Sequence, residues 1–74
     1  MNTITQIIAL SSTGALLIWH ETQNDWVGYE QEVPNTDASE LKYAKAKALD
    51  YPAIKKVWME VIDAETNELV ATNI

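Results

Sequence analysis

The segment between the two prolines of the chain, Pro34 and Pro52, constrains the fold most, because it has the composition of a helix. Alanine, leucine and lysine dominate its interior, and all three are strong helix formers. Asp37 is a favourable N-cap, and Glu40 follows three residues later, as in a capping box. Pro52 predicts that the helix ends near Asp50. One stripe of this helix is expected to pack on a sheet, and it consists of Ala38, Leu41, Ala44, Ala48 and Leu49.

The segments on both sides of this helix have the β-branched, apolar or alternating patterns of strands. Strands are predicted at residues 3–10, 15–21, 26–33, 54–62 and 69–74. Short polar turns separate them, and Gly14 suits the left-handed position of a hairpin loop. The order β-β-β-α-β-β predicts the α+β class for a single domain of residues 1–74. We expect an antiparallel sheet of four to five strands with the helix packed on one face.

The charges are unevenly distributed along the chain. The net charge is −6, arginine is absent, and all five lysines lie between residues 42 and 56. The segments before and after this stretch carry ten of the eleven acidic residues. We therefore expect an acidic face and a basic face. Direct nucleic-acid binding is not expected, because proteins that bind nucleic acid usually carry a net basic footprint. The helix lysines, Lys42, Lys45 and Lys47, are expected to solvate its outer side.

Cysteine content and hydropathy indicate the compartment. The chain has no cysteine, which fits a reducing environment. Its first residues lack the basic region of a signal peptide, and no run approaches the roughly 20 apolar residues that span a bilayer. We expect a cytoplasmic protein that does not act at a membrane.

Side-chain alternation assigns the strand residues to the two faces of the sheet. With an even-numbered loop between the second and third strands, Trp19 and Trp26 share a face, and a four-residue loop places Trp19 opposite Gly28. In the fourth strand, Val57 and Met59 are expected to face the helix, with Val61. The more uniformly apolar set of the second and third strands is expected to face it too, and comprises Leu16, Ile18, His20, Val27, Tyr29 and Val33.

The face turned away from the helix is then expected to combine tryptophans with carboxylates. Its candidate binding residues are Trp19, Glu21, Trp26, Glu30, Glu32, Trp58 and Glu60. Tryptophan is enriched at binding hot spots, and surrounding carboxylates steer association toward a basic partner. The competing interpretation is that the tryptophans roof a small core at the ends of the sheet.

No residue pattern indicates catalysis, a metal or another cofactor. His20 is the only histidine, and together with Glu21 and Asp25 it falls short of the ligands that zinc sites assemble. Residues 63–68, DAETNE, place oxygens at alternate positions as calcium loops do, but they lack the glycine and the final glutamate of an EF-hand. With two glycines in the chain there is no phosphate-binding loop. We predict no catalytic residues, no cofactor and no metal.

The stretches VPNTDASELKYAKAKALDY and KKVWMEVIDAETNELVATNI resemble a pattern seen in small phage-encoded proteins. In that pattern a strand ends, a short capping segment follows, an alanine–lysine helix crosses the sheet and a hairpin closes the domain. Several anti-CRISPR proteins and related inhibitors of host defence look like this. The resemblance covers about half of the chain and rests on architecture. It implies a stoichiometric inhibitor, acting in the host cytoplasm, that docks on a basic, nucleic-acid-handling bacterial protein.

The sequence is therefore compatible with two functions. The first is a non-enzymatic protein-binding module that docks an acidic, tryptophan-containing sheet face on a basic protein. The alternative is a structural or self-assembling protein, in which the sheet face or the last strand pairs with a second copy of the chain to form a homodimer.

Overall fold

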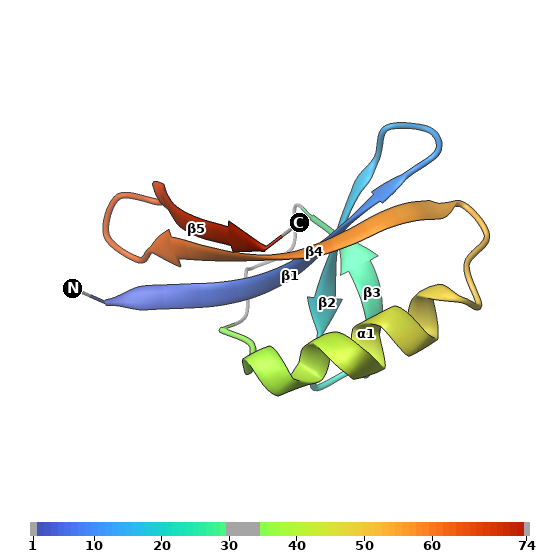
Figure 1. The fold of residues 1–74 in the computed structure, drawn as a ribbon, viewed down its shortest axis with the longest axis horizontal. Coiled ribbons are helices and arrows are strands. Elements are labelled where there is room, and N and C mark those ends of the chain that lie inside the picture. The colour runs from blue at the N-terminus through green and yellow to red at the C-terminus, as the bar shows by residue number, and fades with distance from the viewer. Residues whose placement is uncertain (1, 30–34, 74) are drawn as a thin grey trace.

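A computed structural model describes residues 2–29 and 35–73 as one antiparallel sheet with a helix on one side (Figure 1). The strands are β1 (Thr3–Ser11), β2 (Leu16–His20), β3 (Asp25–Gly28), β4 (Ile54–Asp63) and β5 (Leu69–Asn73). A 3-10 turn, η1 (Ala38–Glu40), leads into the helix α1 (Leu41–Ala48). The α+β class and the antiparallel sheet with one helix are confirmed. Two details differ from expectation: β3 ends at Gly28, and α1 is preceded by the 3-10 turn.

The strand order across the sheet is β3-β2-β1-β4-β5. The two longest strands, β1 and β4, form its centre and pair from Thr3–Asp63 to Ser11–Ile54. The β2–β3 hairpin pairs with β1 only from Ile8 to Leu10. It therefore projects from one half of β1 and leaves the edge of the other half without a strand partner among the described residues.

The chain returns to this free edge of β1 just before the helix. Thr36 N–H donates to the Thr5 carbonyl over 2.9 Å, and Thr5 N–H donates to Asn35 Oδ1 over 3.1 Å. These two bonds satisfy both backbone groups of Thr5 at an otherwise unpaired position. They also fix the point from which η1 and α1 start across the sheet.

The helix begins as predicted at Asp37 but not with a capping box. The Asp37 carboxylate accepts from Ser39 N–H at 2.9 Å, which confirms Asp37 as the N-cap. The Glu40 carboxylate instead accepts from the indole N–H of Trp19 at 3.1 Å. Glu40 therefore ties the start of α1 to β2, and the prediction that it caps the helix is wrong.

The helix lies on the face that carries Trp19 and Trp26, which corrects the predicted orientation of the sheet. The two tryptophans are 0% and 8% exposed and pack edge to face, with ring centroids 5.5 Å apart and an interplanar angle of 70°. The indole N–H of Trp26 donates to the Ala44 carbonyl in α1 at 3.2 Å. Two tryptophans bury a large apolar area, and both indole N–H groups find acceptors on this side.

The pairing parity of β2 and β3 was predicted correctly, but the pairing partners were not. Four residues, 21–24, connect the strands, so Trp19 and Trp26 do share a face. They are direct cross-strand partners, whereas Gly28 lies opposite Leu17. The set expected under the helix, which includes Leu16, Ile18, His20 and Val27, lies by alternation on the opposite face, and Val33 lies outside the described residues.

The remaining helix contacts follow the predicted stripe in its middle and depart from it at its ends. Ala44 is fully buried, and Leu41 and Ala48 pack against the core with Val57 and Met59 of β4, as expected. Ala38 is exposed because it lies in η1, where three residues per turn change the helical phase. Leu49 lies beyond the end of α1 and is 84% exposed.

The close approach of α1 to the tryptophans depends on the small side chain of Ala44. We predict that Ala44→Leu lowers the free energy of unfolding by about 1–3 kcal/mol, because there is no room for a larger side chain. Ala46→Leu makes the same change on the exposed side of α1 and is expected to have little effect. Urea unfolding of the two variants measures the difference, and equal stabilities would contradict this packing.

Candidate functional site

The sheet face opposite α1, called here the helix-free face, is not covered by any helix among the described residues (Figure 1). Strand pairing arranges its side chains in rows across the sheet. The central row is apolar, with Ile8 of β1 between Ile18 of β2 and Trp58 of β4, and both isoleucines are buried whereas Trp58 is half-buried. The next row pairs Gln6 with Glu60. This face therefore places polar groups directly beside an apolar centre.

Trp58 and Glu60 form the most prominent feature of the helix-free face. They are two residues apart in β4 and both are half-buried. The indole N–H of Trp58 donates to Glu60 Oε1 at 2.9 Å, and the ammonium of Lys56 lies 5.9 Å from the ring centroid. Trp58 is thus held in place by its neighbours along the strand. Its position opposite the helix, and that of Glu60, agree with the prediction.

A pocket of about 370 Å³ opens beside Glu60. Its described lining residues are Gln6, Tyr29, Glu60, Ile62, Asn67 and Leu69. Gln6 is 1% exposed, and its Oε1 has no hydrogen-bond partner among the residues that the structure describes. A buried unpaired carbonyl oxygen is unfavourable and is rare in folded proteins. The sequence did not indicate this pocket, because nothing in the local pattern shows that Gln6 points inward next to Glu60.

The other predicted binding residues are not gathered on the helix-free face. Trp19 and Trp26 are core residues beneath α1, so the prediction that they form an exposed surface is wrong. Glu21 is exposed in the β2–β3 turn. Glu30 and Glu32 lie outside the described residues. Of the predicted set, the structure brings together Trp58 and Glu60.

The β4–β5 turn places further acidic residues next to the pocket. Asp63 Oδ1 accepts from the backbone N–H groups of Glu65 and Thr66, at 2.8 and 3.3 Å, which closes a tight turn. Asn67 has a left-handed backbone with φ 61°, a conformation that asparagine tolerates. The same turn carries Glu68. This segment is a hairpin turn, as predicted, and it extends negative charge from Glu60 toward one end of the sheet.

His20 and Asp25, whose pattern in the sequence is insufficient for a zinc site, each bond to a different neighbour. His20 Nδ1 lies 2.7 Å from Thr22 Oγ1, and Asp25 Oδ1 accepts from the hydroxyl of Tyr51 at 2.7 Å. No group of three or more His, Cys, Asp or Glu side chains that could hold a metal occurs in residues 2–29 and 35–73. The stretch from Trp19 to Trp26 is therefore a hairpin that supports the core.

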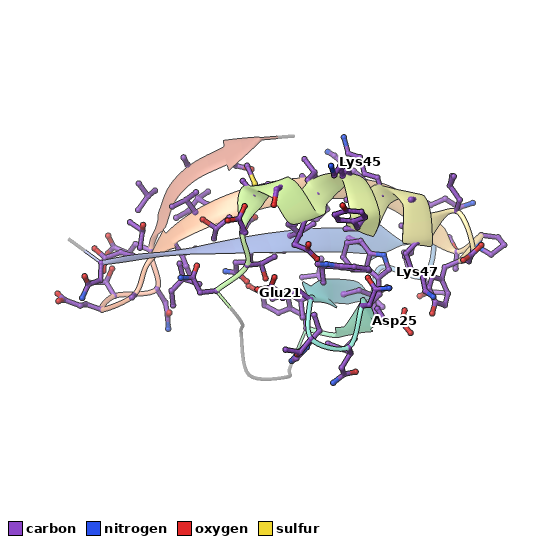
Figure 2. All side chains as sticks on the ribbon, turned by 90° about the horizontal axis from the view of Figure 1, so that it is seen from below. Glu21, Asp25, Lys45 and Lys47 are labelled. Carbon is purple, nitrogen blue, oxygen red and sulfur yellow. The ribbon has the colours of Figure 1, made fainter. Side chains whose placement is uncertain are left out.

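Asp25 also links the hairpin to the end of the helix. Figure 2 shows Asp25 beside Lys47 at the C-terminal half of α1, with Lys45 at the opposite edge of the helix. The Tyr51 hydroxyl, the Trp26 N–H and the charge of Lys47 all lower the pKa of Asp25. The bond to Asp25 in turn raises the pKa of Tyr51. Lys42 and Lys45 are exposed as expected, whereas Lys47 is half-buried.

Comparison with known proteins found no relationship: no family model matches the chain, and neither curated proteins nor solved structures gave a match. The described residues contain no helix with the length and apolar character needed to cross a membrane.

The Tyr51–Asp25 hydrogen bond predicts that the stability of the fold depends on pH. In Tyr51→Phe the pKa of Asp25 is expected to rise toward its ordinary value of 3.8, because the strongest donor to the carboxylate is lost. A carboxyl group whose pKa is lowered by folding stabilises the folded state at pH values above its ordinary pKa. This stabilisation is lost as the pH falls through the folded-state pKa. The wild type is thus more stable than Tyr51→Phe at neutral pH, and the difference disappears in acid.

NMR titration of the carboxyl groups measures this effect in one experiment. The pKa of Asp37 is lowered by Ser39, far from Tyr51 in the chain, and serves as an internal control that the substitution leaves unchanged. If Asp25 titrates at the same pH in both proteins, the bond to Tyr51 does not form in solution.

Tryptophan quenching tests which indoles lie on which face. We predict that acrylamide quenches mainly Trp58, since Trp19 and Trp26 are buried under α1. Trp58→Phe is expected to remove the accessible component and to leave blue-shifted, poorly quenched emission. Strong quenching that persists in Trp58→Phe would mean that the helix does not cover the other two indoles.

Proposed function

We propose that this chain is a non-enzymatic protein-binding module that docks its helix-free face on a basic protein. The observation that carries the proposal is the pairing of Trp58 with Glu60 on a sheet face without a covering helix among the described residues. Hot spots at protein interfaces are commonly tryptophans held in a fixed orientation and surrounded by polar groups. The hydrogen bond from the indole to Glu60 restricts the side chain before a partner arrives, which lowers the entropic cost of binding.

The charge distribution supports a basic partner. The chain has a net charge of −6, and the acidic β4–β5 turn continues from the Glu60 side of the sheet. The exposed lysines Lys42 and Lys45 lie on α1, on the other side of the sheet, whereas Lys56 lies beside Trp58 on the helix-free face. A molecule with this arrangement is oriented by a positively charged surface so that its acidic side approaches first.

A stoichiometric inhibitor in the cytoplasm is the biological role that this surface fits best. Basic patches on nucleic-acid-handling proteins bind phosphates, and the carboxylates of a small protein can occupy the same positions. The resemblance to phage-encoded anti-CRISPR inhibitors points to the same role and stays a prediction.

Self-assembly is the second candidate, and the edge strand β5 favours it. Leu69 and Val70 are 57% and 50% exposed at the free edge of the sheet. An exposed apolar edge is a template for pairing with another strand. A second copy of the chain could add its own β5 there and form a continuous sheet across a two-fold axis.

Substitutions that each remove one negative charge separate docking through this face from general acidity. The wild type is used to capture partners from a bacterial lysate, and the binding of each basic protein identified is then measured with purified components at low and high salt. We predict that Glu60→Gln weakens binding about tenfold or more, since it removes the central charge but keeps an acceptor for Trp58. Higher salt is expected to weaken wild-type binding as well.

Asp50→Asn is the matched control, because it makes the same change in net charge at an exposed position after α1. It is expected to bind almost as tightly as the wild type. Equal losses in the two variants, or captured partners without a basic surface, would contradict docking through the helix-free face. A dimer that persists on dilution and is disrupted by Val70→Lys would favour self-assembly instead.

A further inference from the structure

We infer that the pocket on the helix-free face receives an arginine side chain of the bound protein. This inference rests on the proposed function and identifies the partner group that the face recognises. The pocket combines two oxygen acceptors, Gln6 and Glu60, with the apolar side chains of Ile62 and Leu69. Its volume of about 370 Å³ is at the small end of ligand pockets and suits a single side chain.

The first acceptor is the carboxamide oxygen of Gln6. The residue is 1% exposed, and its Oε1 has no hydrogen-bond partner among the described residues. A buried acceptor without a donor destabilises the protein, and a donor supplied by a ligand removes that penalty. A ligand N–H that reaches Gln6 therefore contributes more to binding than a bond to an exposed group does.

The second acceptor is the carboxylate of Glu60. Gln6 and Glu60 are direct cross-strand partners in β1 and β4, so their side chains leave the same face as nearest neighbours. The indole N–H of Trp58 donates to Oε1 of Glu60. The pocket thus presents a negatively charged carboxylate beside a buried amide oxygen that lacks a donor among the described residues.

The residues that line the pocket favour some ligands with N–H donors over others. An anion is excluded by the charge of Glu60, and no lysine is among the described lining residues. A lysine ammonium is compact and strongly hydrated, so it loses more hydration on entering a partly apolar site. A guanidinium is planar and weakly hydrated, and its fork of N–H groups can reach two acceptors at once. Its aliphatic stem can pack against Ile62 and Leu69.

An isosteric pair of small ligands provides the test. The ¹⁵N- and methyl-labelled protein is titrated at low ionic strength with N-acetyl-arginine amide, N-acetyl-citrulline amide or N-acetyl-lysine amide. Arginine is expected to shift the side-chain amide of Gln6 and the methyl groups of Ile62 and Leu69 in a saturable way. Citrulline has the same shape as arginine without the charge, and its affinity is expected to be lower by about tenfold or more. The same is expected for lysine.

Substitution of the two acceptors shows whether they form the site. Gln6→Met keeps a similar length but removes the oxygen, so its unfolding midpoint is expected to equal or exceed that of the wild type while the arginine shifts are lost. Glu60→Gln is expected to abolish the preference for arginine over citrulline. Gln23→Met, in the exposed β2–β3 turn, is the matched control and should bind arginine as the wild type does.

The outcomes separate this inference from the proposed function. Equal binding of arginine and citrulline, or full arginine binding by Gln6→Met and Glu60→Gln, would overturn the inference. If such results accompany a partner whose binding depends on Glu60, the docking face stands and its arginine pocket does not. If arginine binds as expected but partner binding is insensitive to Glu60→Gln, the pocket stands and docking through it is refuted.

Discussion

The edge-to-face contact between Trp19 and Trp26 is the interaction on which the rest of this small structure depends. The two rings form the centre of the core, and each indole N–H donates to the helical segment. Trp26 bonds the Ala44 carbonyl in the middle of α1, and Trp19 bonds Glu40 at its start. A helix of eight residues has little stability of its own, so these contacts also explain why it forms.

This attachment determines the properties of the other face of the sheet. One short helix can cover only one face of the sheet, and its contacts with Trp19 and Trp26 place it on the face that carries them. The third tryptophan, Trp58, is left on the opposite side with Glu60 and the pocket that contains Gln6. The surface proposed to bind a partner is thus a consequence of how the core formed. It is preorganised because Trp58 is restrained by the neighbours of its own strand.

Much of the architecture could be predicted from the residues alone, because it depends on local chemistry. The composition between Pro34 and Pro52 predicted the helix, and Asp37 acts as its N-cap as expected. The four-residue turn gave the correct parity for Trp19 and Trp26. The candidate site was predicted less well: Trp58 and Glu60 were placed correctly, whereas both other tryptophans were assigned to the wrong face.

The sequence by itself determined which segments are strands, where the helix starts, and which side chains share a face of a strand, because dihedral preference, capping and alternation act over a few residues. Only the tertiary structure decided which of the two faces the helix covers. Which face is covered depends on the apolar area buried and the hydrogen bonds formed by residues of β1, β2, β3 and β4 together. No local sequence pattern contains that information. The insertion of β4 beside β1, which brings Gln6 against Glu60, is likewise a long-range pairing. The pocket therefore exists only in the folded sheet.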